Sequence, residues 1–100
     1  PDLVPLKLAA PAPQVFEHAR ALVRERGWSV VAENEDDLRI EATEKSRLFG
    51  FVDEVVLRIA ETSDGTRVDM RSRSRLGRSD LGVNAARIRA FLTDLAARSR

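Results

Sequence analysis

The chain of 100 residues contains no cysteine and no tyrosine, and it has a single histidine and a single tryptophan. Without cysteine there is no disulfide, no thiolate zinc site and no cysteine nucleophile. A serine–histidine–carboxylate triad would need His18 beside a serine nucleophile. The helical pattern places His18 on the side of its helix opposite Val15 and Leu22, so we expect it to be solvated.

Long apolar runs are also missing. No run approaches the roughly 20 residues that span a bilayer, and no signal peptide is visible. The glycines form no phosphate-binding loop, and the acidic residues at 33–37 lack the spacing of an EF-hand. We therefore expect no cofactor and no metal ion. One hundred residues suffice for one domain with a modest core, so we expect residues 1–100 to be a single domain. The chain begins at Pro1 without methionine, so we expect it to belong to a longer protein.

Charge is nearly balanced, with 17 basic and 16 acidic side chains and a net charge of +1. A generic nucleic-acid-binding protein carries a large basic excess. The most arginine-rich segment, residues 67–78, contains no aromatic side chain on which a base could stack. We therefore do not expect a nucleic-acid partner, although binding through exposed arginines stays open as an alternative.

Hydrophobic periodicity predicts five strands and two helices in the order β-α-β-β-β-β-α. The apolar stripes of the two helices consist of Val15, Phe16, Ala19, Leu22 and Val23, and of Leu81, Ala85, Ile88, Leu92 and Leu95. Both stripes can be buried on one face of a curved antiparallel sheet, so we predict an α+β fold. Its element order is similar to that of TATA-binding-protein-like folds, an analogy that carries no function.

The two longest strands, residues 51–61 and 66–75, form a predicted hairpin. Asp64-Gly65 suits a two-residue turn, because these residues adopt the positive φ angles that a tight turn requires. This turn pairs Ser63 with Thr66 and Val55 with Ser74. Both strands then direct their apolar residues to the same side of the sheet.

The outward side of this hairpin is rich in arginine. Alternation along the strand places Arg67, Arg71, Arg73 and Arg75 on the solvent face. Charge runs most often form a solvated surface. Because the arginine fork also suits phosphate and carboxylate, the alternative is a basic face of Arg71, Arg73 and Arg75 that binds a small anion, an acidic lipid headgroup or an acidic protein surface.

The inward side becomes polar toward the end of the hairpin and continues into the start of the last helix. A candidate pocket there comprises Asp53, Ser72, Ser74, Arg78, Ser79, Asp80 and Asn84. Polar groups that face a core need partners or water. These residues therefore form either a ligand pocket or a buried network that fixes the loop to the sheet, with Ser79 or Asp80 as the helix cap.

Two stretches resemble a known bacterial family. They are IEATEKSRLFGFVDEVVLRI, residues 40–59, and RVDMRSRSRLGRSDLGVNAARIRAFL, residues 67–92. The family, domain of unknown function family 1499, has the patterns GF-x-D-D/E-V-V and R-V-D-x-R-S-x-S-R-x-G-x-S-D-L-G-x-N. The resemblance implies no reaction. The opening PDLVPLKLAAPAPQVF, residues 1–16, resembles the family's lead-in to its first helix. In one subgroup with this lead-in the domain is the soluble C-terminal part of a protein whose earlier segment crosses the membrane, which implies membrane association through a segment outside this sequence.

Three function hypotheses follow. The first is a non-catalytic binding or interaction domain that holds a small anion or a partner's acidic group at the polar end of the hairpin, with Arg73 and Arg75 at the rim. The second is a hydrolase-like or lyase-like enzyme that uses Asp53 or Asp80 as a base. The third is nucleic-acid binding through the outer arginines. The long hairpin could also pair edge to edge in a homodimer.

Overall fold

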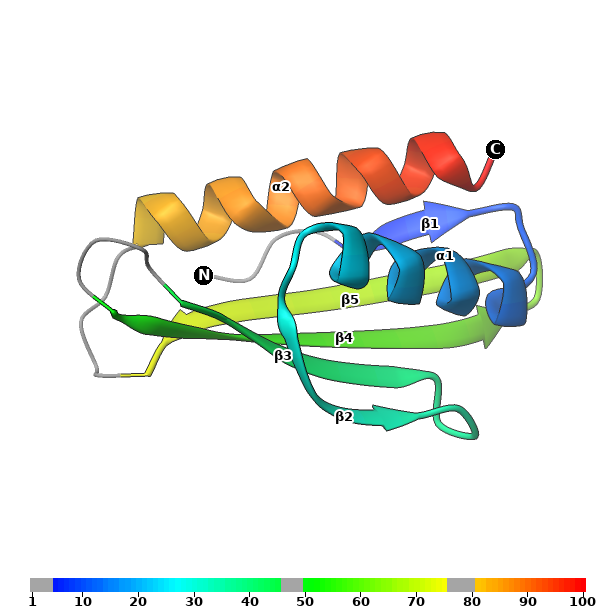
Figure 1. The fold of residues 1–100 in the computed structure, drawn as a ribbon. Helices are drawn as coiled ribbons and strands as arrows, with labels where there is room; N and C mark the ends of the chain where they lie inside the picture. The colour runs from blue at the N-terminus through cyan, green and yellow to red at the C-terminus, as the bar shows by residue number, and fades with distance from the viewer. Residues whose placement is uncertain (1–4, 46–49, 76–80) are drawn as a thin grey trace.

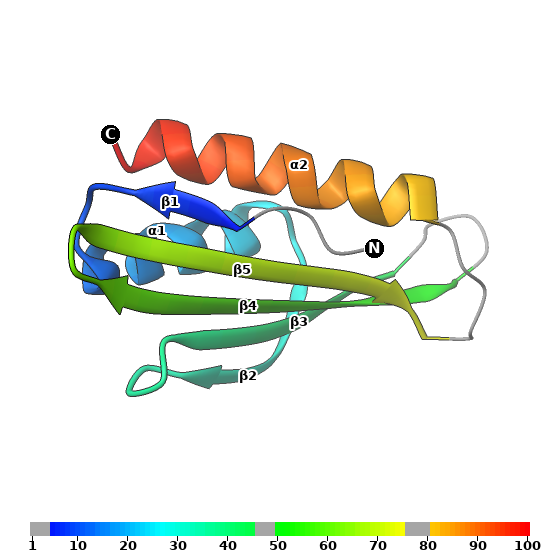
Figure 2. The same cartoon turned by 180° about the vertical axis from the view of Figure 1, so that it is seen from behind.

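The computed structural model describes residues 5–45, 50–75 and 81–100. Its elements are β1 (Leu6–Leu8), α1 (Ala12–Glu25), β2 (Ser29–Asn34), β3 (Arg39–Lys45), β4 (Val52–Thr62), β5 (Gly65–Ser74) and α2 (Leu81–Arg98). The strands form one antiparallel sheet in the order β1-β5-β4-β3-β2. Both helices cover the same face of this sheet (Figures 1 and 2). The predicted α+β fold and element order are confirmed.

The core lies between the helices and the covered face of the sheet, called the inner face below. The predicted stripe of α1 is buried, together with Ala12. The inner face contributes the alternate residues Ile40, Ala42, Val55, Leu57, Ile59, Val68 and Met70. Because side chains alternate along a strand, the residues between them point to the opposite, open face. One layer of helices on one sheet therefore leaves the second sheet face without a covering layer.

The buried stripe of α2 differs in part from the prediction. Ile88, Leu92 and Leu95 are buried as expected, but the stripe also contains Phe91 and Asn84. Phe91 stacks on Trp28, with ring centroids 5.4 Å apart. The difference arises because this helix packs against both β5 and α1 (Figure 1), which buries a wider strip than one heptad pattern suggests.

The register predicted for the β4–β5 hairpin is wrong by two residues. Ser63 and Asp64 form the turn, so Thr62 pairs with Gly65, and Val55 pairs with Ser72 rather than Ser74. Because the period of a strand is two, a shift of two keeps every side chain on its predicted face.

Gly65 lies in the ladder because β1 passes directly beside it. It has a φ of +148°, and a Cβ at this position would overlap the carbonyl oxygen of Leu8. Only glycine combines that φ with so close an approach. The contact with β1 therefore favours Gly65 as the first residue of the strand over a place in the turn.

A homodimer through the hairpin stays a prediction, although β4 itself has no open edge, because β3 and β5 pair along its two sides. The first and last strands of the sheet order are β1 and β2. In β2 every residue is exposed, and the register shifts between Val30 and Ala32. Such a bulge disrupts the regular edge on which a second copy would pair.

The expectation for His18 is also wrong. Its ring is half-buried, and Nδ1 lies 2.9 Å from the Oγ of Ser99, which is itself buried. The C-terminal residues after α2 reach the first helix and cover this side of it, which the pattern of α1 alone does not reveal.

No helix in the described ranges is long and apolar enough to cross a membrane.

Candidate functional site

The inner face carries a polar cluster where α2 begins. The structure brings together Asp53 of β4, Ser72 and Ser74 of β5, and Asn84 of α2, all four of them predicted pocket residues. The Ser72 hydroxyl donates to Asn84 Oδ1 at 2.6 Å, and Asn84 Nδ2 donates to Ser74 Oγ at 3.4 Å. The other predicted pocket residues, Arg78, Ser79 and Asp80, lie outside the described residues.

Arg87 of α2 is the centre of this cluster, and the sequence analysis missed it. Its guanidinium donates to Glu44 Oε1 at 2.7 Å and to Asp53 Oδ2 at 2.8 Å. It also donates to Ser72 Oγ at 2.9 Å and Asn84 Oδ1 at 2.7 Å. The Arg87 side chain is 12% exposed. One guanidinium therefore joins three strands of the sheet to the helix.

The ionic partners explain why an arginine lies on an inward helix face. Glu44 and Asp53 are direct cross-strand neighbours, so two carboxylates meet on the inner face. Like charges directly opposite each other destabilise a sheet, and Arg87 compensates both. A signal for Arg87 was present, since it follows Asn84 by three positions and precedes Phe91 by four, which places all three on one side of a helix.

Chemically, the cluster consists of groups that satisfy one another. Asp53 accepts a hydrogen bond from Arg87, so its carboxylate is held as an ion-pair acceptor. A general base needs a carboxylate free to reach a substrate proton. Networks of this kind fix one arrangement of the surrounding elements. The arrangement favours a structural network over a ligand pocket, and it gives the enzyme hypothesis no support at Asp53.

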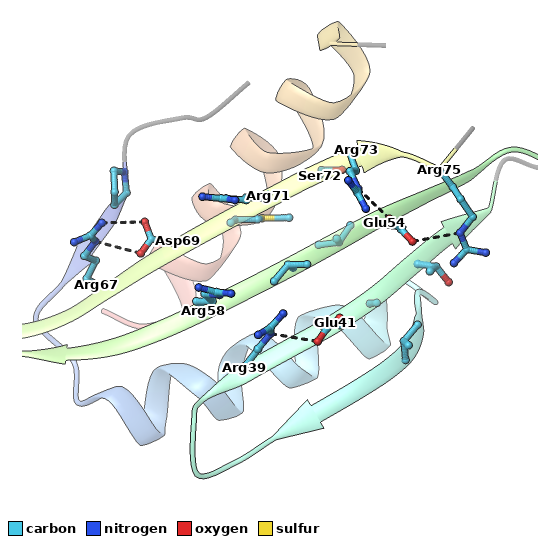
Figure 3. A pocket seen from close by; sticks show the side chains of 17 residues that line it. Arg39, Glu41, Glu54, Arg58, Arg67, Asp69, Arg71, Ser72, Arg73 and Arg75 are labelled. Atoms are coloured by element: carbon cyan, nitrogen blue, oxygen red, sulfur yellow. Dashed lines mark hydrogen bonds and ion pairs between the residues drawn. The ribbon is translucent and has the colours of Figure 1, made fainter. Parts of the chain in front are cut away.

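The open face of the sheet carries the second candidate site. A groove of about 840 Å³ lies over β3, β4 and β5 (Figure 3). The charged residues that line it are Arg39, Glu41, Glu54, Arg58, Arg67, Asp69, Arg71, Arg73 and Arg75. These are six arginines and three carboxylates, so the charged lining has an excess of three positive charges. The predicted basic face of Arg71, Arg73 and Arg75 is part of this groove.

Several of these charges are paired with one another. Glu54 accepts hydrogen bonds from Arg73 Nε at 3.0 Å and Arg75 Nε at 3.3 Å. The hydrogen bond from Arg73 is the main cause that lowers the pKa of the Glu54 carboxyl. Desolvation opposes it, and the hydrogen bond from Arg75 adds to the lowering. At one end of the groove, Arg67 Nε lies 3.2 Å from Asp69 Oδ2.

In the middle of the groove, the positive charges of the arginines are less well balanced by carboxylates. Arg39 and Arg58 are direct cross-strand neighbours on β3 and β4. Arg39 Nε lies 3.2 Å from Glu41 Oε2, yet this buried N–H has no hydrogen-bond partner among the described residues, because the two groups are not aligned for one. Arg58 forms no ion pair within the described part of the chain. Sequence reasoning missed both residues, because they come from strands outside the arginine-rich segment.

A metal centre is not formed by these groups. Across the described ranges, no three histidine or acidic side chains gather closely enough to hold a metal ion. The acidic residues at 33–37, which lack the spacing of an EF-hand, are exposed. The chemistry available on the open face is therefore that of guanidinium groups, which bind carboxylates and phosphates.

Together, these observations define an α+β protein with two helices on one sheet face, an ionic network under the second helix and a cationic groove on the open face. The chain belongs to the family described as "Protein of unknown function (DUF1499)", which it matches over residues 1–95. No curated protein matches the chain. The family description specifies no ligand.

Proposed function

We propose that this chain is a non-catalytic binding domain that holds an anionic group, a carboxylate or a phosphate, on the open face of its sheet. The observation that supports the proposal is the groove with six arginines against three carboxylates. Guanidinium groups offer planar, bidentate donors to such anions, and they stay charged at all physiological pH values. The ligand is a small anion or an acidic group of a partner protein.

The open face is a better candidate than the inner polar cluster. In the inner cluster, Arg87 already donates to two carboxylates, a serine and an asparagine. A ligand anion there would have to displace these partners. In the groove, by contrast, Arg73 is 83% exposed along its side chain, and Arg67 and Arg75 are each 51% exposed. Their donors are accessible without rearrangement of the core.

A direct test is a titration followed by amide chemical shifts at low salt, with inorganic phosphate and a hexaglutamate peptide as probes. The wild type should show shifts concentrated on β3, β4 and β5. Replacing Arg71 and Arg73 by glutamine should weaken peptide binding by about tenfold, since two charge-assisted contacts are lost. The matched control replaces Arg24 and Arg89, two exposed helix residues, by glutamine and removes the same charge.

Four outcomes would overturn the proposal. The first is no response to either probe, and the second is a response confined to the helices. The third is tighter binding of a single-stranded oligonucleotide than of the peptide, with a steep salt dependence, which would assign the face to nucleic acid instead. The fourth is equal weakening of peptide binding in the open-face variant and in the helix control, which would mean that only the net charge of the protein matters.

We also propose that the domain is tethered to a membrane through a segment outside this sequence. The similarity of its lead-in to the family subgroup with membrane-spanning segments supports this. The test is fractionation of the full-length protein from its native cell. Recovery in the membrane pellet after a high-salt wash is expected, and recovery in the soluble fraction would refute the proposal.

A further inference from the structure

In the middle of the open-face groove, arginines outnumber the carboxylates that pair with them. Arg39 and Arg58 face each other across β3 and β4, so two guanidinium groups lie in neighbouring positions on the groove floor (Figure 3). Opposed like charges destabilise a sheet. In contrast to the inner carboxylate pair, which Arg87 compensates, no described carboxylate bridges these two arginines.

The nearby carboxylates are engaged elsewhere or poorly aligned. Asp69 lies opposite Arg58 in the β4–β5 register, but its carboxylate pairs with Arg67 on its own strand. Glu41 approaches Arg39 Nε without forming a hydrogen bond, so a buried N–H remains unsatisfied. A buried donor without an aligned acceptor is unfavourable. Arg39 Nε itself is buried, but the Arg39 side chain as a whole is 38% exposed, so an anion between the two guanidinium groups could contact both and neutralise Arg58.

Apolar side chains adjoin this point. Val56 lies two residues before Arg58 on the same face of β4, with Glu41 and Arg71 as its cross-strand neighbours. Val31, at the bulge of β2, also lines the groove and is 64% exposed. Exposed apolar surface beside a cationic centre suits a ligand that is itself amphiphilic. The groove volume of about 840 Å³ matches the size of small-molecule sites, roughly 300–1,000 Å³.

We infer that the Arg39–Arg58 pair is the primary anion site and that its ligand is a small amphiphilic monoanion, with the anionic group between the two arginines and an apolar body over Val56. This inference rests on the proposed function and narrows it from any anionic group to one ligand class. The flanking ion pairs at Glu54 and Asp69 then mark the ends of the site, because the arginines there, unlike Arg58, already have a carboxylate partner.

The test compares three probes by amide shifts and calorimetry: octanoate, acetate and hexaglutamate. Octanoate should bind the wild type at least about tenfold more tightly than acetate, because several methylene groups leave water. Arg58→Gln should weaken octanoate binding by about tenfold through loss of a charged contact. The control Arg24→Gln removes the same charge on the helix side and should bind octanoate as the wild type does.

A second variant separates the apolar contribution from the ionic one. Val56→Thr keeps the β-branched shape, so the strand is preserved, but it adds a hydroxyl to the groove floor. This variant should lose most of the preference for octanoate and keep its affinity for acetate. Circular dichroism of each variant establishes that the sheet is intact.

The outcomes distinguish the proposed binding function from the inference about its ligand and its site. If hexaglutamate shifts the open face but octanoate binds no better than acetate, the binding function stands and the amphiphilic ligand is refuted. If Arg58→Gln binds octanoate as the wild type does, the Arg39–Arg58 site is refuted even where octanoate is preferred. If none of the three probes shifts the open face, both proposals fail together.

Discussion

Replacing Arg87 by methionine is the sharpest perturbation of the fold. Methionine keeps most of the side-chain length, so the change removes the guanidinium with little loss of packing. It leaves Glu44 and Asp53 as neighbouring carboxylates without a cation, and Ser72 and Asn84 without one donor each. Breaking a fully buried ion pair costs about 3–5 kcal/mol.

The cost here should be smaller, because the network is only partly buried. The side chains of Arg87 and Asp53 are 12% and 16% exposed, but that of Glu44 is 41% exposed, so water can compensate it. We therefore expect a loss of about 2–3 kcal/mol in the free energy of unfolding. In a domain of this size, such a loss corresponds to a decrease in Tm of about 10–20 °C.

Urea unfolding followed by circular dichroism measures this loss. The control is Arg89→Met, two positions along the same helix, where the side chain is exposed. A surface change of this type should stay within about 0.5 kcal/mol of the wild type. If Arg87→Met were as stable as this control, the guanidinium would contribute nothing to holding α2 on the sheet, and the structural interpretation of the inner cluster would be wrong.

Three further predictions concern the sheet and the core. Gly65→Ala should destabilise the protein by more than about 2 kcal/mol in urea unfolding, because a Cβ overlaps the Leu8 carbonyl; an unchanged midpoint would contradict the close approach. Glu54→Gln should remove stability that is present above the ordinary glutamate pKa of 4.5 and is lost as pH falls through the lowered pKa of the folded state, so the two unfolding curves should converge at low pH. Phe91→Ala should cost about 3–5 kcal/mol, because it removes a buried ring that stacks on Trp28, and a loss below about 1 kcal/mol would refute that packing.

The faces of the strands could be predicted from the sequence, whereas the register of the hairpin could not. Alternation of Val68 and Met70 with arginines fixes which side is inward, and this pattern does not depend on the turn. The turn was predicted at Asp64-Gly65, whereas the structure has it at Ser63-Asp64, and both positions give the strands the same parity. The approach of β1 to Gly65 distinguishes them, and that contact joins residues more than fifty positions apart.

The candidate sites, too, could be predicted from the sequence only in part. The inward polar residues of the hairpin could be identified from parity, but Arg87 acquires its role from Glu44, which lies on a strand that pairs at a distance in sequence. Arg39 and Arg58 likewise become neighbours only through the β3–β4 register. Local patterns indicate where polar and charged side chains point. They do not indicate which side chains from other strands they meet.

The second helix is attached to the sheet by two different kinds of interaction. Its first turns are held by the Asn84 and Arg87 contacts, and its later turns by the packing of Ile88, Phe91 and Leu95. Concentrated salt weakens ionic contacts but strengthens apolar burial, whereas urea weakens apolar burial. The helix can therefore open from its N-terminal end without disruption of the core, and amide hydrogens near Arg87 should exchange earlier than those near Leu95.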